Sequence, residues 1–140
     1  MKKSLLYLVL FSILTMGMVC KEEPPVDNRL KIVNYSDKKI SVTLSSLYPD
    51  TSLAEYYEKY GERLELLGSA TSSLEVYDSW EDVYKQFISD TILFFIFDTN
   101  VVTTVPWDTI RKNYMILERY DLTYDDLVKM NWTITYPNDK

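Results

Sequence analysis

The chain contains no histidine among its 140 residues. Imidazole is the side chain most often used as a general base near neutral pH, and it is the commonest metal ligand. Histidine-based catalytic triads, zinc hydrolysis and haem ligation through histidine are therefore excluded. Carboxylates are the main acid–base groups that remain.

Cysteine and glycine are almost as scarce. Cys20 is the only cysteine, so the chain can form no internal disulfide. The three glycines stand at positions 17, 61 and 68, too few and too far apart for the glycine-rich loops that hold phosphates or dinucleotides. We therefore expect no cofactor, no metal centre and no catalytic cysteine.

The first twenty residues have the pattern of a secretion signal. Lys2 and Lys3 precede an uncharged run, LLYLVLFSILTMGMV, at residues 5–19. Its length suits the apolar part of a signal peptide and falls short of the roughly 20 residues of a membrane-spanning helix. We predict a signal peptide over residues 1–19, with a spanning anchor as the alternative.

Cys20 directly follows the apolar run. Alanine occurs only at Ala54 and Ala70, so the A-x-A cleavage site of an ordinary signal peptide is missing. The segment resembles a bacterial lipoprotein signal, in which the cysteine is acylated, although Val19 stands where such signals prefer a small residue. Several acyl chains, at about 0.8 kcal/mol per buried CH₂, anchor a protein stably. We predict lipid on Cys20; an inert thiol is the alternative.

Acidic residues outnumber basic ones in the rest of the chain. Without Lys2 and Lys3, 13 basic residues face 21 acidic ones, a formal charge of −8. Binding to nucleic-acid phosphates requires clustered Lys and Arg, whereas the basic residues here are scattered among acids. We expect no nucleic-acid partner and no direct adhesion to anionic lipid, so the membrane contact would run through the lipid on Cys20.

Residues 20–28, with the charged and proline-containing KEEPP stretch, suit a linker, and residues 29–140 suit one globular domain. Within 39–46, apolar and hydroxyl residues alternate, which predicts a strand with one buried face. Residues 30–35 are expected to pair with it as an antiparallel hairpin. Residues 92–97, ILFFIF, are apolar at every position and predict a central strand covered on both faces. Further strands are expected at 74–77, 114–120 and 132–136.

Short helices are predicted between these strands by a hydroxyl residue followed three positions later by an acid, the pattern of a capping box. The pairs are Ser52 with Glu55, Ser79 with Asp82, and Thr123 with Asp126. Pro106 suits the start of a further short turn through Ile110. The expected fold is a mainly β (α+β) domain, a single antiparallel β-sandwich with immunoglobulin-like hairpins and short helices in its connections. An α+β sheet covered on one face is the alternative.

Two residue types could carry a site. A carboxylate-based glycan hydrolase needs two facing acids, and the candidates are Glu81, Asp82, Asp98, Asp108, Asp125 and Asp126. Asp98-Thr99-Asn100 offers oxygen ligands but lacks the glycine and distal glutamate of a calcium loop, so a turn is favoured. Aromatic side chains bind ligands and partners by stacking. Trp80 and Trp132 are expected in the core, while Trp107, beside Pro106, is either core or ligand-facing.

The segments ILFFIFDTN, VPWDTIRKNYMILERYDLTYDDL and MNWTITYP, between residues 90 and 137, resemble small uncharacterised lipoproteins of Bacteroides-type bacteria. The N-terminal stretch NYSDKKISVTLSSLYPDTSL is similar to the corresponding part of that group. The resemblance implies an outer-membrane address, on the periplasmic or the cell-surface face, and supplies no activity. It also implies an export role for Lys21-Glu22-Glu23 and O-glycosylation at Asp90-Thr91-Ile92 and Asp108-Thr109-Ile110.

We therefore expect a lipid-anchored protein of the cell envelope, without catalytic activity, that binds a glycan or a protein partner. The competing hypotheses are a glycan hydrolase that uses two carboxylates and a purely structural envelope protein.

Overall fold

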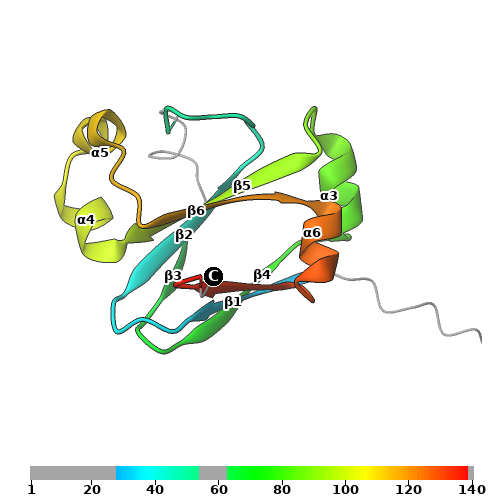
Figure 1. Cartoon of the computed structure of the whole chain (residues 1–140), viewed down its shortest axis with the longest axis horizontal. Helices are drawn as coiled ribbons and strands as arrows, with labels where there is room; N and C mark the ends of the chain where they lie inside the picture. Colours follow the sequence, from blue (N-terminus) through cyan, green and yellow to red (C-terminus); the bar gives the residue numbers. More distant parts are fainter. Residues whose placement is uncertain (1–27, 54–62, 139–140) are drawn as a thin grey trace, which may run out of the picture.

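The computed structural model describes residues 28–53 and 63–138. Its strands form two sheets that face one another, and short helices lie at the two ends (Figure 1). The prediction of a mainly β sandwich with helices in its connections is confirmed. One sheet has the order β4 (Thr71–Glu75), β1 (Arg29–Asn34), β7 (Thr133–Tyr136). The other has the order β3 (Leu64–Leu66), β2 (Ile40–Ser45), β5 (Thr91–Asp98), β6 (Glu118–Thr123).

The two sheets differ in strand direction. Every pair in the four-stranded sheet is antiparallel. In the three-stranded sheet, β1 pairs antiparallel with β4 and parallel with β7. The expectation of a wholly antiparallel sandwich is therefore wrong at one strand pair. β7 is an edge strand of the three-stranded sheet, and β6 is an edge strand of the four-stranded sheet. The hydroxyl of Tyr120 on β6 donates to the carbonyl of Thr135 on β7 at 2.5 Å, and this bond joins the two edges.

The predicted N-terminal hairpin is wrong, although both of its strands exist. β1 belongs to the three-stranded sheet and β2 to the four-stranded one, so the connection between them crosses the sandwich. Asn34 organises this corner. Its amide nitrogen donates to the carbonyls of Lys38 at 2.7 Å and Leu67 at 2.9 Å, and its side-chain oxygen accepts from the backbone N–H of Ser36 at 3.0 Å. The buried amide of Asn34 is thus bonded both to the connection between β1 and β2 and to the residue that follows β3.

Strand β5 lies between β2 and β6 and is buried along almost its whole length. The prediction of a central strand covered on both faces is confirmed. Alternate side chains enter two separate clusters because a strand points successive residues to opposite faces. Ile92, Phe94 and Ile96 face the other sheet. Leu93, Phe95 and Phe97 face a second cluster, built with Leu53, Trp107 and Ile110.

Strand β2 departs from its expected one-sided burial. Ile40 and Val42 lie in the inter-sheet core, as the alternation predicts. The hydroxyl residues Ser41, Thr43 and Ser45 are buried as well. They are paired across the sheet with Phe97, Phe95 and Leu93, on the face of the second cluster. Helix α4 (Thr99–Thr104) adjoins this face, and the hydroxyls of Ser41 and Thr99 lie 3.0 Å apart.

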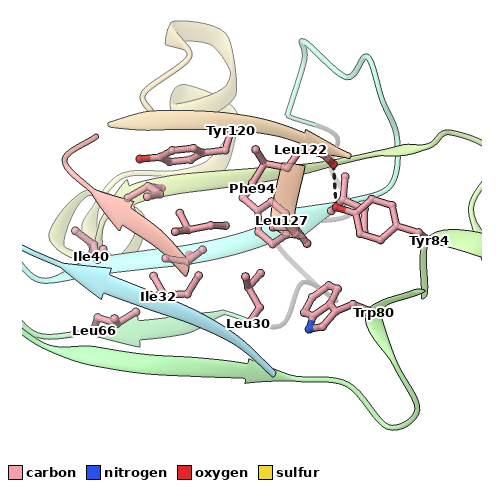
Figure 2. Close-up of a cluster of buried hydrophobic side chains, with 14 residues drawn as sticks. Leu30, Ile32, Ile40, Leu66, Trp80, Tyr84, Phe94, Tyr120, Leu122 and Leu127 are labelled. Atoms are coloured by element: carbon pink, nitrogen blue, oxygen red, sulfur yellow. Dashed lines mark hydrogen bonds between the residues drawn. The ribbon is translucent and has the colours of Figure 1, made fainter. Parts of the chain in front are cut away.

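The space between the sheets is filled by the first cluster, shown in Figure 2. Leu30 and Ile32 of β1 face Phe94 of β5 across this core, and Trp80 fills one end of it. Trp80 is fully buried, so its predicted place in the core is confirmed. Trp132 is partly buried and packs against the same cluster.

Two capped helices close that end of the sandwich. In α3 (Trp80–Gln86) the Ser79 side chain accepts from the backbone N–H of Asp82, as predicted. In α6 (Tyr124–Lys129) Thr123 and Asp126 form a complete capping box. Helices α4 and α5 (Trp107–Asn113) lie at the opposite end (Figure 1). The helix expected after Ser52 falls largely on residues 54–62, outside the described residues.

Several predicted bounds shift. Pro106 is the cap of α5 rather than its first residue, and the helix runs beyond Ile110. The strand expected at 114–120 begins only at Glu118. Tyr114 has a left-handed backbone, with φ of 49°, and caps the C-terminus of α5, so no strand starts at this residue. Asp98-Thr99-Asn100 starts helix α4 instead of forming a turn, since the Asp98 side chain accepts from the backbone N–H of Asn100.

Candidate functional site

A surface pocket of about 400 Å³ lies beside α3 and the junction of β6 with α6. Helix α3 contributes three side chains, the junction contributes three more, and Asp90 comes from the turn before β5. The residues that line it are Glu81, Tyr84, Lys85, Asp90, Thr123, Tyr124 and Asp125.

The helix caps fix the position of these side chains. Ser79 and Thr123 start α3 and α6, and each hydroxyl accepts a hydrogen bond from a backbone N–H of the first turn. Each helix therefore starts at a defined residue. Glu81 and Asp125 both stand in these first turns. The hydrogen bond from the Thr123 hydroxyl lowers the pKa of Asp126, so this carboxylate is ionised. It is bonded within the capping box of α6.

Tyr84 lies behind the pocket surface and offers no free hydroxyl. Its side chain is buried, and its hydroxyl donates to the carbonyl of Leu122 at 2.8 Å, the dashed line in Figure 2. Burial raises the pKa of Tyr84 well above its usual value, with a smaller contribution from the charge of Asp126. The phenol is therefore neutral at physiological pH and ties α3 to β6.

Tyr124 continues this aromatic wall. Its ring centroid lies 6.0 Å from that of Tyr84 at an interplanar angle of 77°, and 5.5 Å from that of Trp132 at 71°. Both are edge-to-face contacts, which orient aromatic pairs and stabilise them. Tyr124 is thus held between two rings while remaining partly exposed at the pocket.

Charged side chains form the rim. The ammonium of Lys85 lies 2.7 Å from a carboxylate oxygen of Glu81 and 3.8 Å from one of Asp82. Its pKa is raised, chiefly by the hydrogen bond with Glu81. Asp90 accepts from the hydroxyl of Thr91 at 2.9 Å. An aromatic wall with a few polar groups at its rim is the usual composition of a small-molecule site.

The structure separates the six carboxylates predicted from the sequence. Glu81 and Asp125 line the same pocket, whereas Asp82 and Asp126 cap α3 and α6. Asp98 and Asp108 belong to α4 and α5 at the opposite end of the sandwich. Within residues 28–53 and 63–138, no group of three or more acidic side chains is placed to hold a metal ion.

Trp107, the one aromatic singled out for a ligand, is only 6% exposed. Its ring lies 5.9 Å from that of Phe97 in the second cluster, and the guanidinium of Arg63 lies 5.8 Å from its centroid. This position favours the core role, because the remaining surface is too small for a ligand to stack on.

Five pocket residues had no ligand-site role in the sequence interpretation: Tyr84, Lys85, Asp90, Thr123 and Tyr124. Tyr84 and Tyr124 fall on the apolar spacing of their helices, so the pattern assigns them to the core. Only the packing of α3 beside α6 brings both rings to one surface. Tyr124 is the first residue of α6, whereas Tyr84 lies in the second turn of α3, so the two tyrosines share no position relative to their caps that would mark them in the sequence.

Cys20 lies outside the described residues. Among the helices of the described part, none is long and apolar enough to span a membrane. Of the two Asp-Thr-Ile sites, Thr91 is buried at the start of β5, while Thr109 is exposed on α5. The hydroxyl of Thr91 is also bonded to Asp90, so Thr109 is the more accessible of the two.

Comparison with protein-family models, with curated proteins and with solved structures found no match for this chain.

Proposed function

We propose that this protein is a lipid-anchored binding module of the bacterial outer membrane, and that the pocket between α3 and α6 is its ligand site. The membrane part of the proposal rests on the sequence: a charged start, an uncharged run over 5–19 and the single Cys20. The palmitoyl-type acyl chains on that cysteine would hold the domain at the periplasmic or the cell-surface face.

The observation that carries the binding role is the partly exposed ring of Tyr124, packed against the buried ring of Tyr84, in a pocket rimmed by carboxylates. Aromatic surface suits the apolar face of a sugar ring, and carboxylates accept hydrogen bonds from sugar hydroxyls. A glycan is therefore the favoured ligand. A protein partner is the other candidate, since tyrosine is enriched among the residues that contribute most to binding in protein interfaces.

A glycan array and a pull-down with the full chain in detergent test the binding role. We expect array signals that a pocket variant loses. A blank array together with an empty pull-down would refute the proposal. Mass spectrometry of the mature N-terminus tests the anchor separately: an acylated Cys20 is expected, and a free thiol would contradict it.

A glycan hydrolase is a second candidate, because Glu81, Asp90 and Asp125 line one pocket. Hydrolysis requires one carboxyl group that donates a proton and a second that acts across the ligand. Glu81 is held by Lys85 at 2.7 Å, which leaves Asp90 and Asp125 as the pair. Release of reducing ends from any glycan bound on the array would favour this candidate over simple binding.

A further inference from the structure

Among the described residues that line the pocket, three acids, Glu81, Asp90 and Asp125, face one cation, Lys85. Lys85 is shared by Glu81 and Asp82 through ion pairs of 2.7 and 3.8 Å. Asp90 and Asp125 face the same space. Within the described part of the chain, neither of these two carboxylates makes an ion pair. Among the described residues, the pocket therefore holds two acids that form no ion pair with a protein cation.

The aromatic side chains of the pocket favour one kind of positively charged group as the partner of Asp90 and Asp125. Tyr84 is only 7% exposed and its hydroxyl is bonded to Leu122, so its ring supports the pocket wall from behind. The ring of Tyr124 is partly exposed at the pocket, and its edge contacts with Tyr84 and Trp132 hold it in place. Proteins bind organic ammonium groups with aromatic rings, whose negative faces attract cations. Neighbouring carboxylates add a Coulombic attraction that is stronger beside a low-dielectric wall.

We propose that this pocket selects sugars that carry a free, protonated amino group. The inference rests on the proposed function, because it names the ligand class of the same pocket. The sugar ring packs on Tyr124, and its ammonium group lies against Asp90 and Asp125. Acetylation of the amine removes the charge and weakens binding, and an acidic sugar is repelled by the same carboxylates.

The test uses the full chain in detergent at about pH 5.5, where amino groups are protonated. The two probes are the trimer of glucosamine and the trimer of N-acetylglucosamine, which differ in charge and share a backbone. Calorimetric titration should show the amino trimer binding about fivefold more tightly, the upper end of the effect of one exposed ion pair. Added salt should weaken this preference because it screens the charges.

Three variants locate the effect. Asp125→Asn should weaken binding of the amino trimer about fivefold. Asp108→Asn removes the same charge from α5 at the opposite end of the sandwich, and it should bind like the wild type. Lys85→Gln removes the only cation among the described residues that line the pocket, and this variant should bind the amino trimer more tightly.

Several results would overturn the inference. If the acetylated trimer binds and the amino trimer is not preferred, the charge selection is wrong while the proposed glycan binding stands. Equal loss in Asp125→Asn and Asp108→Asn would mean that the pocket is not the site. Trilysine binding as tightly as the amino trimer would refute selection of a sugar. If neither trimer binds and the glycan array is blank, the proposed function fails as well.

Discussion

Asn34 shows how one buried polar residue decides where the chain turns. Its side chain is fully buried and bonds to Ser36, Lys38 and Leu67, so it holds the corner between the two sheets against the turn after β3. Gly68 lies in this turn, where a Cβ atom would come within 2.5 Å of the Asp37 carbonyl oxygen. The corner therefore requires an amide at one position and a residue without a side chain at the other.

We expect Asn34→Ala to lower the free energy of unfolding by about 2–3 kcal/mol, because the carbonyls of Lys38 and Leu67 lose their buried donor. Urea denaturation measures the loss. Asn100→Ala, at an exposed position of α4, is the control and should change stability by about 0.5 kcal/mol or less. Equal effects of the two substitutions would contradict this role for Asn34.

The helices are the elements whose starts follow most directly from local sequence. The Ser79 and Thr123 caps form as predicted because capping depends on neighbouring residues only. The partner of a strand depends instead on contacts far along the chain. Residues 30–35 and 39–46 have the alternation of two strands, yet nothing in that alternation shows that the turn between them crosses from one sheet to the other.

Thr123→Ala should destabilise the protein by about 1 kcal/mol at neutral pH, since the backbone N–H of Asp126 loses its acceptor. A pH dependence follows from Asp126, whose pKa is lowered in the folded state, first by the Thr123 hydroxyl. Its contribution is complete above the unfolded pKa and is lost as pH falls through the folded pKa. The stability gap between the wild type and Asp126→Asn should therefore be present at pH 7 and disappear in strong acid. A gap that is unchanged between these conditions would show that the carboxylate does not stabilise the cap.

At the scale of the molecule, the two central strands of the four-stranded sheet, β2 and β5, are covered on both faces. The ILFFIF segment predicts this, because it offers no polar face to water. The alternation of apolar and hydroxyl residues in β2 predicts that one face of this strand is exposed to water. This prediction is wrong, because Ser41, Thr43 and Ser45 are buried on the face of the second cluster. The pocket could not be predicted for a related reason. Its walls come from α3 and α6, which are separated along the chain and meet only through the fold.

Phe94→Ala and Phe95→Ala test this two-sided burial. The two side chains enter different clusters, and each is fully buried. Each substitution should cost about 3–5 kcal/mol in the free energy of unfolding. Tyr77→Ala, at a side chain that is 99% exposed, is the control and should be close to neutral. A small effect of Phe95→Ala beside a large one of Phe94→Ala would mean that only the inter-sheet core stabilises the sheet.

The most direct test of the account compares glycan-array binding by the wild type, Asp125→Lys and Asp108→Lys, each as the full chain in detergent. The two substitutions reverse one charge each, the first in the pocket and the second on α5 at the opposite end of the sandwich. We predict that the wild type and Asp108→Lys bind the same glycans and that Asp125→Lys loses them. A wild-type protein that binds no glycan, or an Asp125→Lys variant that binds as the wild type does, would contradict the assignment of the pocket.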